Sequence, residues 1–164
     1  MANKMTARTL LVAALLAACP AARSADYAGP RPPKPDVPFL LHADRLVETE
    51  KNEAKEVKAK NDTAYVVNGA ASPARTPLPE PVFVLLTKDF VPEKIELYRM
   101  QVRNGNREVV LGPKRKRTED RPIHMLVTRL AERLYKLEVD EPLEDGEYCL
   151  TPEGANAVFC FQIY

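Results

Sequence analysis

The chain has 164 residues, a net charge of +1, 15 prolines and 6 glycines. This near-neutral balance excludes a general nucleic-acid or membrane-surface binder, because such proteins carry a strong excess of basic residues. The proline content, together with many Val, Tyr, Phe and Thr positions, favours strands joined by stiff loops over a helical bundle.

Residues 1–25 contain the three parts of an export signal. Lys4 and Arg8 supply a basic start, and residues 9–18 form an uncharged, leucine-rich run. Such a run makes roughly 15 Å of helix, about half the thickness of a bilayer's hydrocarbon core. Small residues follow, and a protease that reads small side chains would cut near residue 25. The segment therefore predicts a removable signal-peptide helix rather than a permanent anchor.

A second interpretation of this segment concerns Cys19. The sequence Leu16-Ala17-Ala18-Cys19 resembles the bacterial lipobox, in which the cysteine thiol is acylated and becomes the new N-terminus. That resemblance implies a protein held to the outer envelope by lipid, whereas cleavage near residue 25 releases it. A buried N-terminal core helix is the remaining alternative. Both export interpretations predict a periplasmic or extracellular protein that meets a membrane only through its signal peptide or lipid anchor.

Residues 26–36 form a proline-rich lead that contains Pro30, Pro32, Pro33 and Pro35. Proline at this density excludes helix and central strand, and it favours extended polyproline II. We therefore expect a linker here, followed by a single domain over residues 37–164. A proline-recognition motif within the lead is the alternative interpretation.

Short apolar runs separated by turn residues continue along the rest of the chain. Asn104-Gly105-Asn106 is a strong hairpin signal, because Asn and Gly accept positive φ at little cost. Residues 72–81 are expected to form a stiff loop, since they include four prolines. The predicted strands cover residues 37–42, 53–60, 63–68, 81–86, 93–102, 107–111, 123–127, 134–139, 148–151 and 158–164.

Two stretches leave the choice between helix and strand open. Residues 46–60 have the Glu, Lys and Ala content of a surface helix, but their apolar stripe is weak. A hairpin of residues 53–60 with residues 63–68 is the favoured interpretation. Residues 128–132 also fit one helical turn after the strand that precedes them.

The sequence Gly146-Glu147-Tyr148 begins the part of the chain that resembles a known class. In immunoglobulin-like sandwiches a Gly precedes an inward Tyr by two places at a sheet corner. Immunoglobulin domains place a Cys two residues after that Tyr, where this chain has Leu150, and they use a core Trp that is missing here. The resemblance is to secreted Ig-like β-sandwich domains of uncharacterised exported bacterial proteins. It implies an all-β, mainly antiparallel sandwich of about 7–9 strands, and it supplies no activity.

Cys149 and Cys160 are the two cysteines that follow the export segment, and an even count in an oxidising compartment indicates a disulfide. Side chains two residues apart in a strand share a face, so a core-facing Leu150 and Phe159 put both cysteines on the opposite face. A register that pairs Leu150 with Phe159 sets the cysteines opposite each other. Two free thiols are the alternative.

The remaining candidate functional residues are the two histidines and one run of basic residues. His42 and His124 lie in predicted strands, without the spacing of a metal motif, and the chain has no nucleophile elbow, phosphate loop or dinucleotide fingerprint. We therefore expect no catalytic, cofactor or metal site. The basic run is a candidate anion-binding loop, or a solvated loop balanced by nearby acids. Its residues are Lys114, Arg115, Lys116 and Arg117.

These observations predict an exported, non-catalytic binding or structural module of the cell envelope or extracellular space. Its partner would be an envelope or extracellular protein, or a polysaccharide, and not a nucleic acid. We also expect an exposed aromatic or apolar patch, with the loop at residues 72–81 as its place. The alternative is a small extracytoplasmic enzyme with a surface cleft near His42 or His124.

Overall fold

The computed structural model describes residues 27–59, 62–111 and 121–164, which form thirteen strands and a single turn of 3-10 helix, η1 (Pro92–Lys94). The predicted signal peptide with Cys19, and the basic run at residues 114–117, lie outside these ranges. No helix among the described residues is long and apolar enough to cross a membrane. The strands are β1 (Pro38–His42), β2 (Arg45–Glu48), β3 (Glu50–Glu53), β4 (Lys55–Ala59), β5 (Asp62–Asn68), β6 (Arg75–Thr76), β7 (Val82–Leu86), β8 (Ile95–Arg103), β9 (Asn106–Leu111), β10 (Met125–Ala131), β11 (Leu134–Val139), β12 (Gly146–Pro152) and β13 (Ala157–Ile163).

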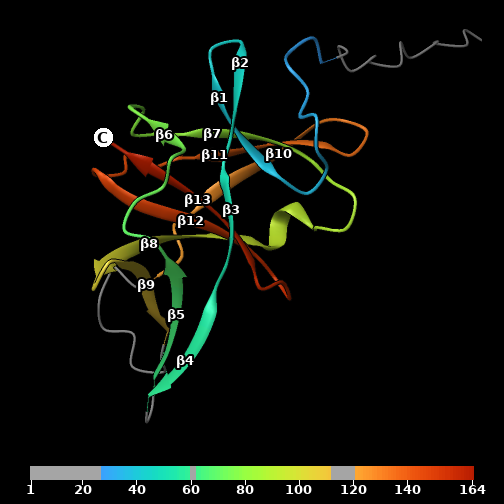
Figure 1. Ribbon diagram of the computed structural model, residues 1–164. Helices are drawn as coiled ribbons and strands as arrows, with labels where there is room; N and C mark the ends of the chain where they lie inside the picture. Colours follow the sequence, from blue (N-terminus) through green and yellow to red (C-terminus); the bar gives the residue numbers. More distant parts are fainter. Residues whose placement is uncertain (1–26, 60–61, 112–120) are drawn as a thin grey trace, which may run out of the picture.

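The all-β prediction is confirmed for this part of the chain, and all strand pairs are antiparallel except the short contact of β6 with β13 (Figure 1). The expected number of strands was too low. The helical alternatives for residues 46–60 and 128–132 are wrong over their described parts, because residues 46–59 lie in extended chain, residues 128–131 belong to β10, and Glu132 is in the turn that follows. The segment from β2 to β4 counts as three strands because it changes partner twice, pairing first with β1, then with β13 and then with β5.

The first sheet has the strand order β10-β11-β7-β1-β2 and packs against part of the second sheet. Its central strand β7 places Phe83 and Leu85 in a large apolar core, where Leu97, Leu150 and Phe161 face them from the second sheet. The rings of Phe83 and Phe161 meet edge to face, with centroids 5.1 Å apart. These contacts form the sandwich core, which alternating apolar side chains on both sheets stabilise.

The second sheet has the strand order β3-β13-β12-β8-β9-β5-β4, and it curls back on itself. Its two outermost strands, β3 and β4, are separated in the chain by Ala54 alone, and Figure 1 shows one running on into the other. On one side the Ala54 N–H donates to the carbonyl of Asn156, and on the other side Lys55 pairs with Val66 of β5. The sheet therefore closes into a barrel-like enclosure on the side away from the sandwich core.

β12 and β13 serve both halves of the molecule, because each strand is buried on both faces. Leu150 pairs with Phe159 and points into the sandwich core, as the sequence predicts. Cys149 and Cys160 point the other way, into a second apolar cluster inside the curled sheet that also holds Met100. The face opposite the sandwich core is thus a second core rather than a solvated surface.

The proline-rich lead lies against the first sheet and is held at several points. Pro32 is buried, and Lys34 forms an ion pair of 2.8 Å with Glu48 of β2. The carboxylate of Asp36 accepts hydrogen bonds from the backbone N–H groups of residues 88–90 at 2.8–3.2 Å. These contacts fix the chain where it enters β1.

The hairpin turn between β8 and β9 confirms the prediction from Asn104 and Gly105. Their φ angles are 50° and 76°, the left-handed values that a two-residue turn of this kind requires at both central positions. Arg103 and Asn106 pair directly across the turn. The turn thereby sets the register in which β9 presents Arg107, Val109 and Leu111 to the inside of the curled sheet.

Candidate functional site

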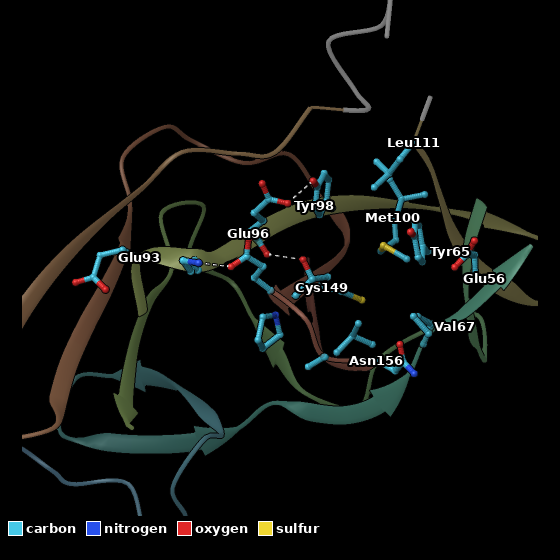
Figure 2. Close-up of a pocket in the computed structure, with 18 residues that line it drawn as sticks. Glu56, Tyr65, Val67, Glu93, Glu96, Tyr98, Met100, Leu111, Cys149 and Asn156 are labelled. Carbon is cyan, nitrogen blue, oxygen red and sulfur yellow. Dashed lines mark hydrogen bonds and ion pairs between the residues drawn. The ribbon is translucent and has the colours of Figure 1, made fainter. Parts of the chain in front are cut away.

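The inside of the curled sheet contains a cavity of about 570 Å³ that is lined from β4, β5, β8, β9, β12 and β13. Its inner part is apolar and is formed by Val67, Met100, Val109, Val158 and Cys149 (Figure 2). A cavity of this size lies within the range of small-molecule sites, which are mostly apolar and carry a few polar groups. The sequence did not predict this cavity.

A fully buried arginine lies on β9, next to the residues of this strand that line the cavity. Arg107 lies on the same face of β9 as Val109 and Leu111, which line the cavity. Its guanidinium forms a bidentate pair with Glu50 of β3 at 2.7 and 3.1 Å, and it donates to the carbonyls of Asn68 and Gly69 at 3.0 Å each. The side chain is 0% exposed, so these partners replace its hydration shell. We refer to Arg107, Glu50 and Glu147 as the ion cluster.

Glu147 of β12 is the third member of the ion cluster and the least well paired. One carboxylate oxygen accepts from the Ser72 N–H at 2.9 Å and lies 3.5 Å from Arg107, and its other oxygen is buried without a partner among the described residues. Burial raises the pKa of Glu147, although the Ser72 N–H and Arg107 act against that rise. Burial also favours the neutral form of Glu50, but hydrogen bonds from Arg107 and Ser72 outweigh it and hold the pKa of Glu50 below its usual value.

Two tyrosine–glutamate pairs line the cavity, one on β8 and the other on β5 and β4, and the glutamate of each pair is exposed. On β8, the Tyr98 hydroxyl donates to the carboxylate of Glu96 at 2.6 Å. On the other wall, Tyr65 of β5 is the direct cross-strand partner of Glu56 of β4, so both side chains point to the same face. Figure 2 shows the two pairs on opposite sides of Met100. Only β9 lies between β8 and β5, which separates the walls by roughly 10 Å.

The mouth of the cavity carries an excess of carboxylates. Glu93 is exposed beside it, and Lys94 forms an ion pair with Glu153, which is its neighbour where β8 pairs with β12. With Glu56 and Glu96, the described lining holds four glutamates and one lysine. The site therefore combines an apolar interior with a negatively charged rim.

The predicted disulfide is confirmed, and it forms part of the cavity wall. The sulfur atoms of Cys149 and Cys160 are 2.03 Å apart, and the two residues are direct cross-strand partners with Cα atoms 4.0 Å apart. Both side chains are fully buried. The bond links β12 to β13 at the point where these strands separate the cavity from the sandwich core.

The two histidines do not come together. His42 ends β1 and His124 precedes β10, with β7 and β11 between these strands, a separation of roughly 14 Å. His124 is exposed and lies 2.8 Å from Asp140, while Nε2 of His42 is buried without a partner among the described residues. Neither lines the cavity. In the part of the chain that the structure describes, no group of three or more His, Cys, Asp or Glu is placed to hold a metal ion.

Residues 72–81, expected to form a loop with an exposed apolar patch, contain the short strand β6 and one exposed large apolar side chain, Leu78, which is 44% exposed. Tyr164, near the end of β13, is 54% exposed. The guanidinium of Arg75 lies 4.1 Å above the Tyr164 ring, and the Tyr164 N–H donates to the carbonyl of Thr76. The loop is thus pinned to β13 rather than free. The other predicted surface feature, the basic run at residues 114–117, falls outside the described residues.

Sequence reasoning missed both the ion cluster and the cavity. A local signal existed for the second core, because residues 148–150 and 158–161 are unbroken apolar runs of the kind that strands buried on both faces show. No local signal marked Arg107, whose partners Glu50 and Glu147 lie far away in the sequence. The comparisons add no relative, since no family model, curated protein or solved structure matches the chain.

Proposed function

We propose that the protein is an exported, non-catalytic binding module whose ligand enters the cavity of the curled sheet. The observation that carries this proposal is a cavity of about 570 Å³ whose inner walls are apolar and whose lining includes exposed residues such as Glu93 and Glu96. Its walls hold tyrosines, a methionine and aliphatic side chains, which bind apolar groups by burial and dispersion. The expected partner of the sequence analysis, a protein or polysaccharide, would meet the surface around this opening.

The proposal of export is supported by the disulfide. Disulfides form and persist in oxidising compartments, and this one links two fully buried cysteines. The signal-peptide pattern at residues 1–25 agrees with that setting.

We also propose that the sandwich half belongs to the Ig-like class. The Tyr148 hydroxyl donates to the carbonyl of Glu144 at 2.7 Å, four residues upstream. A tyrosine that bonds back to the chain in this way at a sheet corner is a feature of such sandwiches. On this proposal the strands β9, β5 and β4 are an addition that extends one sheet of the sandwich into the enclosure.

Binding of a neutral apolar molecule tests the proposed function. We expect 1-octanol to shift the backbone amide signals of residues that line the cavity, and few others, in a titration followed by two-dimensional NMR. Ala54→Trp should weaken this binding at least tenfold, because the indole projects from the wall into the cavity. Ala70→Trp is the matched control, since Ala70 is exposed and does not line the cavity.

Two results would contradict the proposal. The first is that the amide signals shifted by octanol belong to residues away from the cavity. The second is that Ala54→Trp and Ala70→Trp bind octanol with equal affinity. If Ala54→Trp does not fold, Ala54→Leu fills less of the space and replaces it, with an expected loss of about threefold. Circular dichroism and the unfolding midpoint of each variant show whether the fold is retained.

A further inference from the structure

We infer that the cavity selects cationic amphiphiles, molecules with an ammonium head and an apolar tail. This inference rests on the proposed function, because it assigns the chemical class of ligand that the same cavity takes. Its basis is the two exposed carboxylates, Glu56 and Glu96, that line the cavity together with Tyr65, Tyr98 and the apolar interior.

These pairs offer two kinds of attraction to an ammonium group. The exposed carboxylates of Glu56 and Glu96 attract a positive charge directly, and the ring of the half-buried Tyr65 attracts it through its electron density. Tyr98 is buried and contributes through the hydrogen bond that holds Glu96. An ammonium between walls that are roughly 10 Å apart comes within reach of both pairs at once.

The tail of such a ligand fits the apolar part of the cavity. There the walls consist of Val67, Met100, Val109 and Val158, with the disulfide beside them. A hydrocarbon chain that follows the head inward exchanges water for these side chains, which is favourable in proportion to the apolar area buried.

The charge of the opening disfavours the opposite class of ligand. A fatty-acid anion would bring its carboxylate next to Glu56 and Glu96, and the ion pair of Lys94 with Glu153 leaves the described rim net negative. Like charges in contact repel, most strongly where the surroundings are partly shielded from water. A neutral alcohol of the same length gains the tail contacts but not the attraction of the head.

A matched set of three probes tests the inference: octyltrimethylammonium, 1-octanol and octanoate, each titrated by NMR and calorimetry at low salt. We expect octyltrimethylammonium to bind about tenfold more tightly than octanol, because two or three weak charge contacts each contribute about two- to fivefold. Octanoate should bind more weakly than octanol. In about 0.5 M NaCl the preference for the cation should fall to about threefold, because salt screens exposed charges.

Charge-neutralising variants distinguish the effect of carboxylates that line the cavity from the effect of the protein's net charge on ligand affinity. The double variant Glu56→Gln with Glu96→Gln should lower the affinity for octyltrimethylammonium about fivefold or more and leave that for octanol within twofold. The control Glu80→Gln with Glu132→Gln removes the same charge from exposed positions outside the cavity. It should leave both affinities within twofold.

The outcomes distinguish the two levels of the proposal. If none of the three probes reaches the cavity, the proposed function fails. If octanol binds in the cavity but octanoate or octanol binds as tightly as the cation, the function stands and the selection of cationic amphiphiles is overturned. An equal loss of cation affinity in the rim and control variants would also overturn it, because the effect would then be the net charge of the protein.

Discussion

Replacement of Arg107 by methionine should strongly destabilise the fold, since the ion cluster depends on this guanidinium. Methionine retains much of the side-chain volume but leaves Glu50 and Glu147 buried without a cation, and it leaves the carbonyls of Asn68 and Gly69 without their side-chain donor. Removal of one partner from a buried ion pair costs about 3–5 kcal/mol. That is a large part of the total of about 5–15 kcal/mol that a domain of this kind has.

Urea unfolding at pH 7 with the disulfide intact measures this effect. Tyrosine fluorescence and circular dichroism are suitable signals, because the chain has no tryptophan. The control is Arg103→Met, four residues away in the chain, where an exposed arginine lies 3.3 Å from Glu108. It should change the free energy of unfolding by less than about 0.5 kcal/mol, as exposed ion pairs contribute little.

A double-mutant cycle identifies the origin of the loss. If the cost of Arg107→Met comes from an unpaired buried carboxylate, then adding Glu50→Gln should restore about 1–2 kcal/mol. A loss below about 1 kcal/mol for Arg107→Met would refute the reasoning. So would strict additivity of the two substitutions, because it would mean that the two side chains do not depend on each other.

Two further predictions concern the same walls. Burial raises the pKa of Glu147, so the folded state binds a proton more tightly than the unfolded state, and stability falls as the pH rises from about 4.5 through the folded pKa. Glu147→Gln should remove this fall. The pKa of Glu50 is lowered, so we expect the opposite effect from this residue: a stabilisation that is present above about pH 4.5 and that Glu50→Gln abolishes. Unfolding curves from about pH 3.5 to 7 check both, and equal pH profiles in the two variants would contradict them. Replacement of Cys149 and Cys160 by alanine should cost about 2–3 kcal/mol, because the bond closes a loop with a sequence separation of 11. A change below about 0.5 kcal/mol in thermal unfolding would contradict this value.

The C-terminal hairpin could be predicted in register from the sequence, because strand parity left few alternatives. If Leu150 and Phe159 point into the core, Cys149 and Cys160 must lie on the opposite face of the sheet. A shift of the strand register by one residue would move all four side chains to the other face. The hairpin turn at residues 104–105 was equally local, since few residues accept positive φ. Such features depend on neighbours in the sequence.

The closure of the second sheet could not be predicted in this way. The favoured hairpin of residues 53–60 with residues 63–68 is confirmed by the antiparallel pairing of β4 with β5, but the closure also depends on Ala54, where the chain leaves β13 and joins β5, and no local pattern marked the pairing of β3 with β13. The segment of residues 46–60 is rich in Glu and Lys because β3 exposes one face to solvent and residues 55–58 of β4 are all exposed. Long-range pairing decided its conformation and overrode its local helical preference.

Arg107 shows the same limitation for the site. A charged residue just after a hairpin turn is normally solvated, and the sequence gives it no nearby partner. Its carboxylate partners come from β3 and β12, and its carbonyl partners follow β5. These partners come together around Arg107 only because the sheet closes on itself. The ion cluster was therefore as unpredictable from the sequence as the closure.

The restraints around the cavity bear on the choice between a structural and a binding module. An apolar cavity leaves its lining atoms without contacts, which is unfavourable unless the walls are prevented from collapsing. Here the disulfide ties β12 to β13, the ion cluster ties β3 and β12 to β9, and Ala54 joins the two edges of the sheet. Walls held in this way need little rearrangement when a ligand enters, so less of the binding energy is lost to ordering. A purely structural module would gain more stability by filling the space with larger side chains, and the retention of an open, braced cavity therefore favours binding.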